Sequence, residues 1–114
     1  MSNQKFKIWL PAVKKMTHAL SIYDWVQGGL NGNLSNGDIF LQYTSLSDKN
    51  GREIYEGDIA KYCDFDEPVF VRISENRGEW VIDMDKGTTW RHLWASHLNM
   101  EIIGNIYENP ELLA

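Results

Sequence analysis

The chain has little of what marks a crosslinked, exported or membrane-embedded protein. Its 114 residues include one cysteine, Cys63, so no intramolecular disulfide can form, which fits a reducing compartment. No stretch approaches the run of about 18 apolar residues that a membrane-spanning helix requires. The apolar stretch at residues 8–13 is too short for the hydrophobic region of a signal peptide and contains Pro11. We therefore expect a cytoplasmic protein without a membrane segment.

Positive charge is scarce outside the first 16 residues. Those residues contain four lysines and no acid, whereas all 16 aspartates and glutamates lie in the rest of the chain, and the net charge is −5. An acidic body repels a phosphate backbone and mainly keeps a protein soluble. The charge distribution therefore argues against general nucleic-acid binding.

Aromatic residues and alternating apolar patterns are abundant instead. Five tryptophans and five tyrosines favour strands and supply large groups for a small core. Short strand patterns separated by turn signals about every ten residues predict a mainly β fold, a small antiparallel barrel or sandwich with SH3-like barrel elements and one or two short helices. The length predicts one domain over residues 1–114. The expected strands cover residues 5–10, 38–44, 52–55, 59–63, 69–74, 79–84 and 100–107.

The connecting segments are less uniform. Residues 12–17 are expected to be a connection and residues 27–37 a glycine-rich loop, while residues 18–26 are compatible with a strand or a short helix. Residues 88–99 place Trp90, Leu93, Trp94, His97 and Leu98 at helical spacing, which predicts a short helix.

Several residues indicate turns or points of close approach. Asn50-Gly51 is a strong hairpin signal, and Gly57-Asp58 indicates a corner in which glycine takes a positive φ and the carboxylate accepts backbone hydrogen bonds. Gly104 suggests a β-bulge or a point of close approach. Asn109-Pro110 predicts a helix start, with the Asn109 side chain as its cap.

The run LQYTSLSDKNGREIYEGDIAKY, which starts at Leu41, resembles a block of the form QYTGLKDKNGKEIYEGDI in the YopX family of small phage and prophage proteins. The opening around residues 5–16 and the ending IGNIYENPELL at residues 103–113 resemble the same family, and together the blocks cover roughly half of the chain. Ser45 departs from the pattern, since the family usually has glycine there. The resemblance implies a phage or prophage protein acting in a bacterial host cytoplasm. It implies no catalytic residues, although Tyr55 belongs to its most characteristic block.

No constellation of residues indicates an enzyme, a metal site or a cofactor. A calcium loop starting at Asp83 would need glycine and glutamate where Thr88 and Trp94 stand. His92 and His97 are five apart, which is not a ligand spacing on a helix or a strand. Cys63 is expected to be a small core residue. We therefore expect no enzymatic activity.

Protein binding is the leading hypothesis, because tryptophan, tyrosine and arginine are enriched at interfaces and exposed sheet edges favour self-association. We expect a homo-oligomer, or a complex with a phage or host protein. The alternatives are a single-strand nucleic-acid binder that stacks bases on these aromatics, and a hydrolase with an acidic cleft. The candidate interaction surface consists of Trp80, Trp90, Trp94, Arg72 and Arg91.

Overall fold

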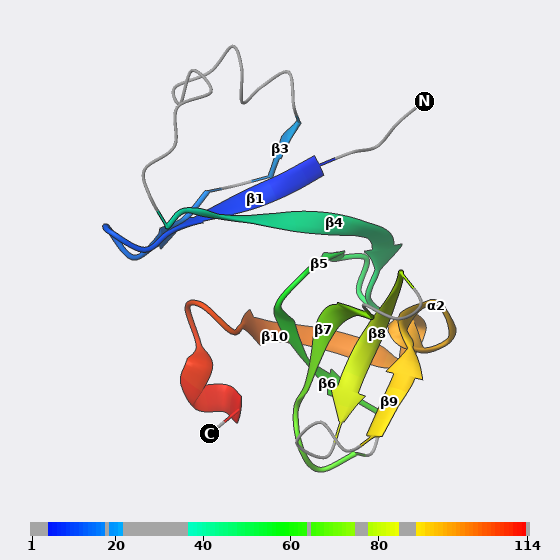
Figure 1. Ribbon diagram of the computed structural model, residues 1–114. Helices are drawn as coiled ribbons and strands as arrows, with labels where there is room; N and C mark the ends of the chain where they lie inside the picture. Colours follow the sequence, from blue (N-terminus) through cyan, green and yellow to red (C-terminus); the bar gives the residue numbers. More distant parts are fainter. Residues whose placement is uncertain are drawn as a thin grey trace.

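The described residues of the chain form two antiparallel five-stranded sheets, and Figure 1 shows their arrangement in the computed structural model. The structure describes residues 5–17, 19–21, 37–63, 65–74, 78–84 and 89–113. The predicted mainly β, barrel-like fold with short helices is confirmed. Within the described ranges, no helix has the length and apolar character to cross a membrane.

The first sheet has the order β2-β1-β4-β5, with β3 also pairing with β1. Its strands are β1 (Lys5–Leu10), β2 (Lys15–Met16), β3 (Leu20–Ser21), β4 (Ile39–Ser47) and β5 (Glu53–Tyr55).

The second sheet has the order β10-β6-β7-β8-β9 and curves around a core. A short helical segment connects β9 to β10, and a turn of 3-10 helix follows β10 near the C-terminus. The elements are β6 (Asp58–Tyr62), β7 (Val69–Ser74), β8 (Glu79–Met84), β9 (Thr89–His92), α2 (Leu93–Ser96), η2 (His97–Asn99), β10 (Met100–Asn105) and η3 (Pro110–Leu113).

The alternation of charged and apolar residues produces strand β1 over the predicted residues. Phe6 and Ile8 are buried on one face, and the strand ends at Leu10, immediately before Pro11. The prediction of a plain connection over residues 12–17 is wrong. The chain turns back at once, and β2 pairs with Trp9 and Leu10. A strand of only two residues is too short to be distinguished from a turn by its sequence pattern.

Strand β4 is longer than predicted because it continues through a bulge at Ser45. Ser45 has a φ of +70°, and the pairing of β4 with β5 shifts register between Tyr43 and Ser47. A left-handed conformation is strained for a residue with a side chain and unstrained for glycine. This explains why a glycine suits the position in sequences of the same pattern.

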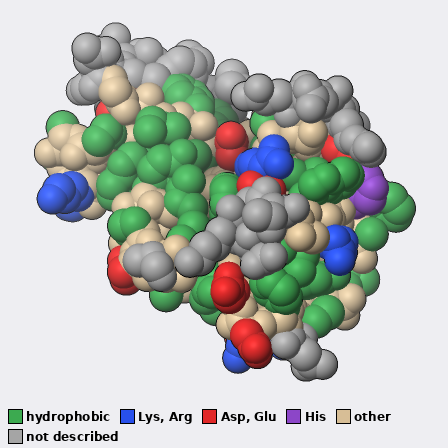
Figure 2. Space-filling model, turned by 60° about the horizontal axis from the view of Figure 1, so that its bottom comes forward, with side chains coloured by type: hydrophobic (Ala, Val, Ile, Leu, Met, Phe, Trp, Pro, Cys, Tyr) green, Lys and Arg blue, Asp and Glu red, His purple; other side chains and the backbone are tan. Residues whose placement is uncertain are grey.

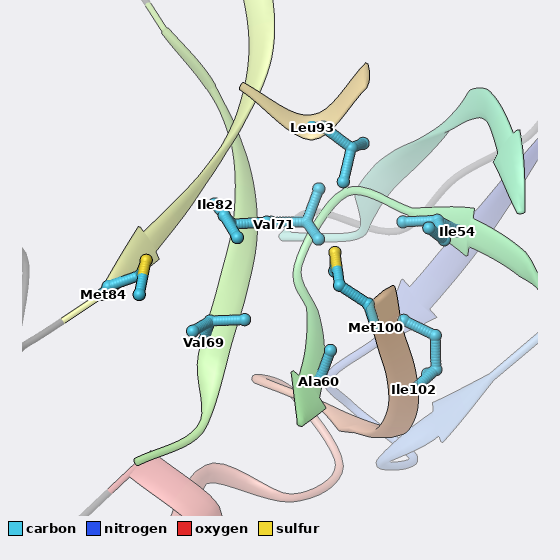
Figure 3. Packing of buried hydrophobic residues seen from close by; sticks show 9 residues of the cluster. All are labelled: Ile54, Ala60, Val69, Val71, Ile82, Met84, Leu93, Met100 and Ile102. Carbon is cyan, nitrogen blue, oxygen red and sulfur yellow. The ribbon is translucent and has the colours of Figure 1, made fainter. Parts of the chain in front are cut away.

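The core lies inside the second sheet. Figure 3 shows Val71, Leu93, Met100 and Ile54 converging from four different elements. Alternation along β7 and β8 supplies one wall, since those strands pair in full register from Phe70–Asp83 to Ser74–Glu79. The buried cluster consists of Ile54, Ala60, Val69, Val71, Ile82, Met84, Leu93, Met100 and Ile102.

The predicted helix over residues 88–99 is half wrong. Residues 89–92 form strand β9, and helical structure begins only at Leu93. Trp94 and Leu98 are 66% and 67% exposed, so their helical spacing does not mark a buried face. The pairing of β9 with β8 satisfies the backbone groups on one side of β9, and this favours the extended conformation.

Two further expectations are corrected. Cys63 is exposed rather than part of the core, because β6 ends at Tyr62 and Cys63 turns away with a φ of +48°. Asn109 precedes η3, but its side-chain oxygen accepts a hydrogen bond from the Asn105 amide at 3.2 Å instead of capping the helix. It therefore fastens the C-terminal segment to the end of β10.

Some predictions fall on segments that are only partly described. Of residues 18–26, Leu20–Ser21 form β3, and residues 18 and 22–26 lie outside the described residues. Of the expected loop at residues 27–37, only Gly37 is described. In the expected turns, residues 64, 75–77 and 85–88 also lie outside the described residues.

Candidate interaction surface

Three aromatic rings lie in contact at the start of the connection from β9 to α2. The Trp90 and His92 ring centroids lie 5.0 Å apart at right angles, and the His92 and Trp94 centroids lie 5.4 Å apart. The Nδ1 atom of His92 is hydrogen-bonded to the Glu79 carboxylate. We call Glu79, Trp90, His92 and Trp94 the aromatic surface. Trp90 is 38% exposed and Trp94 66% exposed. In Figure 2 a histidine side chain lies between hydrophobic side chains at the edge of the molecule.

The register of β8 and β9 places these side chains. Trp90 lies opposite Asp83, and His92 lies opposite Val81. The side chains of Trp90 and His92 are therefore on the same face of the sheet as those of Asp83 and Val81. Arg72 reaches this face from β7, where its Nε atom lies 2.5 Å from the Asp83 Oδ2 atom. An ion pair therefore borders the stacked rings.

The structure brings together only part of the predicted surface. Trp90, Trp94 and Arg72 lie on or beside the aromatic surface, whereas Trp80 lies opposite Ile73 and packs against the core. Arg91 alternates to the other side of β9, and its Nη1 atom donates to the Trp90 carbonyl at 2.9 Å.

Sequence reasoning missed His92 and Glu79. A helical interpretation of residues 88–99 separates His92 from Trp90, whereas a strand places residues i and i+2 on one face. The signal was thus present in the Trp-x-His spacing, but it required the correct secondary structure.

The signature residues around Tyr55 form a turn. Gly57 has a φ of +85°, as a glycine corner requires, and the Asp58 Oδ2 atom accepts a hydrogen bond from the Tyr55 amide at 2.8 Å. The hydroxyl of Tyr55 donates to Glu53, which also pairs with Lys5 at 2.6 Å. These carboxylates bind groups of the chain itself, so their arrangement is that of a structural junction between the two sheets.

Asp58 is the buried ionisable group of that junction. Burial raises the pKa of Asp58 from 3.8 to about 6, and the Tyr55 amide and the Lys7 ammonium only partly oppose this. A folded-state pKa above the unfolded value means that the native state binds the proton more tightly. The stabilisation due to Asp58 is thus complete below about pH 4 and is lost as the pH rises through about 6.

Asp58→Asn should remove this dependence, because the amide oxygen can still accept from Tyr55 and carries no charge. We expect the variant to gain on the order of 2–3 kcal/mol over the wild type between about pH 4 and pH 7.5. Urea unfolding of both proteins across this range measures the difference, in which the titration of all other groups cancels. A constant difference would mean that Asp58 ionises with an ordinary pKa.

Among the residues that the structure describes, no group of three or more histidine, cysteine, aspartate or glutamate side chains gathers that could hold a metal ion.

The grouped side chains of the aromatic surface are suited to packing and hydrogen bonding with another macromolecule.

Comparison with known proteins places the fold and the family. Over 100% of both chains, the protein is similar to the crystal structure of protein EF1440 from Enterococcus faecalis, with a TM-score of 0.67 and 22% sequence identity, a likeness that shows the fold. No curated protein matches the chain. Residues 5–114 match the family described as YopX protein, which agrees with the resemblance in the sequence blocks. The chain therefore belongs to the YopX family.

Proposed function

We propose that this protein is a non-enzymatic accessory protein of a phage or prophage, acting in the bacterial host cytoplasm through a symmetric complex with a second copy of itself. The observation that carries the proposal is the exposure of Trp94, 66%, while its ring lies 5.4 Å from that of His92. A tryptophan held in place by neighbours loses little side-chain entropy when a partner covers it. Tryptophan is also among the residues that most often dominate interface energies.

The charges beside the rings suit a second copy of the chain. A two-fold interface presents the same surface from both sides, so charged groups within it can pair only if both signs occur in one patch. The aromatic surface has the carboxylate of Glu79 on it and the guanidinium group of Arg72 next to it. Two such surfaces related by a two-fold axis can pair acid with base.

Contact through side chains is favoured over pairing of strand edges. Strand β9 is an edge of its sheet, and edge strands can pair with another chain. Here the carbonyl of Trp90 accepts from Arg91 and the carbonyl of His92 accepts from Ser96 at 2.8 Å. Two carbonyl groups of β9 thus already have side-chain donors within the chain, which disfavours the addition of a strand.

The alternatives have less support. A nucleic-acid surface needs cations available for phosphate, but Arg72 pairs with Asp83 and the net charge is −5. For a hydrolase, the carboxylates of the junction are the buried Asp58 and the partly exposed Glu53, and both are hydrogen-bonded to groups of the fold itself.

Trp94→Ala should weaken self-association without harming the fold. Loss of a central interface tryptophan typically costs about 2 kcal/mol, which is roughly a thirtyfold increase in the dissociation constant. Sedimentation equilibrium over a range of concentrations measures this change. Val13→Ala is the matched control, because Val13 is 58% exposed in the turn after β1 and outside the aromatic surface. A wild type that stays monomeric at every concentration would refute the proposal.

A further inference from the structure

A groove of about 560 Å³ separates the tip of the β1–β2 hairpin from the C-terminal segment. Trp9 and Tyr107 form its floor, with ring centroids 6.0 Å apart and planes tilted by 33°. Pro11 and Pro110 add apolar surface. Its rim carries the charged side chains of Lys14, Glu108 and Glu111. In Figure 2 the side of the molecule that holds the hairpin tip and the C-terminal segment shows a continuous hydrophobic area with acidic and basic side chains at its margin.

Hydrogen bonds fix the C-terminal wall of this groove. The Asn105 Oδ1 atom accepts from the amides of Tyr107 and Glu108 at 3.0 and 2.8 Å, so the turn that presents the tyrosine is locked. Asn109 ties the same turn to β10 through its own side chain.

Gly57 supports the tyrosine from behind. A Cβ atom at this position would lie 3.0 Å from the Tyr107 ring, and the Ile106 amide donates to the Gly57 carbonyl at 2.9 Å. The groove is therefore built before any ligand arrives, which lowers the entropic cost of binding.

We propose that this groove binds an extended, proline-rich protein segment that carries a basic residue beside its prolines. Polyproline segments are stiff, lack internal hydrogen bonds and dock on grooves lined by aromatic rings. The tilted pair of Trp9 and Tyr107 offers two ring faces for pyrrolidine rings. Because Glu108 and Glu111 outnumber Lys14 on the rim, a cationic side chain of the ligand is favoured over an anionic one.

Binding of a proline-rich segment in this groove is independent of the self-association proposed above. The groove shares no residue with the aromatic surface, and its ligand is an extended segment rather than a second folded copy. Either proposal can fail while the other holds.

The test is fluorescence anisotropy with a labelled synthetic peptide that contains a Pro-x-x-Pro segment followed by arginine. We expect saturable binding to the 114-residue chain. Replacing the prolines of the peptide with alanine should abolish it, and replacing its arginine with glutamate should weaken it strongly. No binding of the first peptide, or equal binding of the proline-free peptide, would overturn the proposal.

Protein variants locate the binding. Glu111→Lys should weaken it about fivefold, because one favourable charge contact becomes a repulsion. Glu67→Lys makes the same charge change at an exposed residue that does not line the groove, and it should leave binding within about twofold of the wild type. Equal effects of the two changes would mean that net charge, and not the groove, attracts the peptide.

The aromatic floor is tested separately. Trp9→Ala should abolish binding, whereas Trp9→Phe keeps a ring and should retain most of it; a thermal melt of each variant checks that it is folded. Trp94→Ala should bind the peptide like the wild type. Unchanged binding by a folded Trp9→Ala protein would overturn the assignment of the groove.

Discussion

Replacing Gly57 with valine should unfold the protein or bring it close to unfolding. Gly57 has a φ of +85°, a conformation that is strongly unfavourable for a β-branched residue. Its Cβ would also lie 3.0 Å from the Tyr107 ring and 3.4 Å from the Ile106 Cγ1 atom. Strain and overpacking together should cost about 3–5 kcal/mol, a large part of the stability of a small domain. Urea unfolding followed by tryptophan fluorescence measures the loss.

Gly51 provides a matched control for this prediction. Its φ of +82° is nearly the same as that of Gly57, but among the described residues no heavy atom beyond those of its chain neighbours lies within 4 Å of the position that a Cβ would take. Gly51→Val therefore adds the conformational strain without the contact with Tyr107, and it should cost about 1–2 kcal/mol. If the two substitutions destabilise the protein equally, the contact of Gly57 with Tyr107 contributes nothing.

Gly57 also shows which features of the fold can be predicted from the sequence. The positive φ of Gly57 follows from Gly57-Asp58 standing before a strand, because local chemistry dictates it. The contact with Tyr107 does not follow, because that tyrosine is about fifty positions along the chain and meets the turn only after β10 pairs with β6. Local conformation is thus readable at this corner, whereas its long-range partner is not.

Alternation was a reliable guide where both strands of a hairpin were long. Strands β7 and β8 have the predicted bounds because six-residue patterns with turns between them leave little freedom of register. The pattern failed at residues 89–92, where four strand residues run directly into a helical turn. Trp90 and Trp94 are four apart across that boundary, so their spacing imitates one helix face. This error concealed the Trp90–His92 contact on which the aromatic surface depends.

Asp48 stands just before the Asn50-Gly51 turn, and its carboxylate accepts three backbone hydrogen bonds that join two parts of the fold. Its carboxylate is buried, and its Oδ1 atom accepts from the amides of Asn50 and Arg52 at 2.9 Å. Its Oδ2 atom accepts from the Ile102 amide at 2.9 Å, 54 residues along the chain. Burial raises the pKa of Asp48, but these three donors outweigh burial and hold the pKa below its ordinary value of 3.8. The carboxylate therefore links the β4–β5 hairpin to β10.

Asp48→Ala should lower the free energy of unfolding by about 3 kcal/mol or more, because it leaves three amide donors without their acceptor. Asp48→Asn is the more informative change. Its amide oxygen can still serve the amides of Asn50 and Arg52, but its NH₂ group then faces the Ile102 amide, which is itself a donor. The asparagine variant should thus keep the turn and lose the link to β10. Faster hydrogen exchange at the Ile102 amide, compared with that at Arg52, reports this loss.

The pH dependence gives the deciding control for Asp48. A folded pKa below the unfolded value stabilises the protein above about pH 4, and this stabilisation is lost as the pH falls through the folded pKa. The stability advantage of the wild type over Asp48→Asn should therefore shrink in acid, whereas for Asp58→Asn it is the advantage of the variant over the wild type that shrinks in acid. Asp66→Asn, at an exposed position, should change stability by less than about 0.5 kcal/mol at any pH. If Asp48→Asn behaves like Asp66→Asn, the buried carboxylate does not hold the two sheets together.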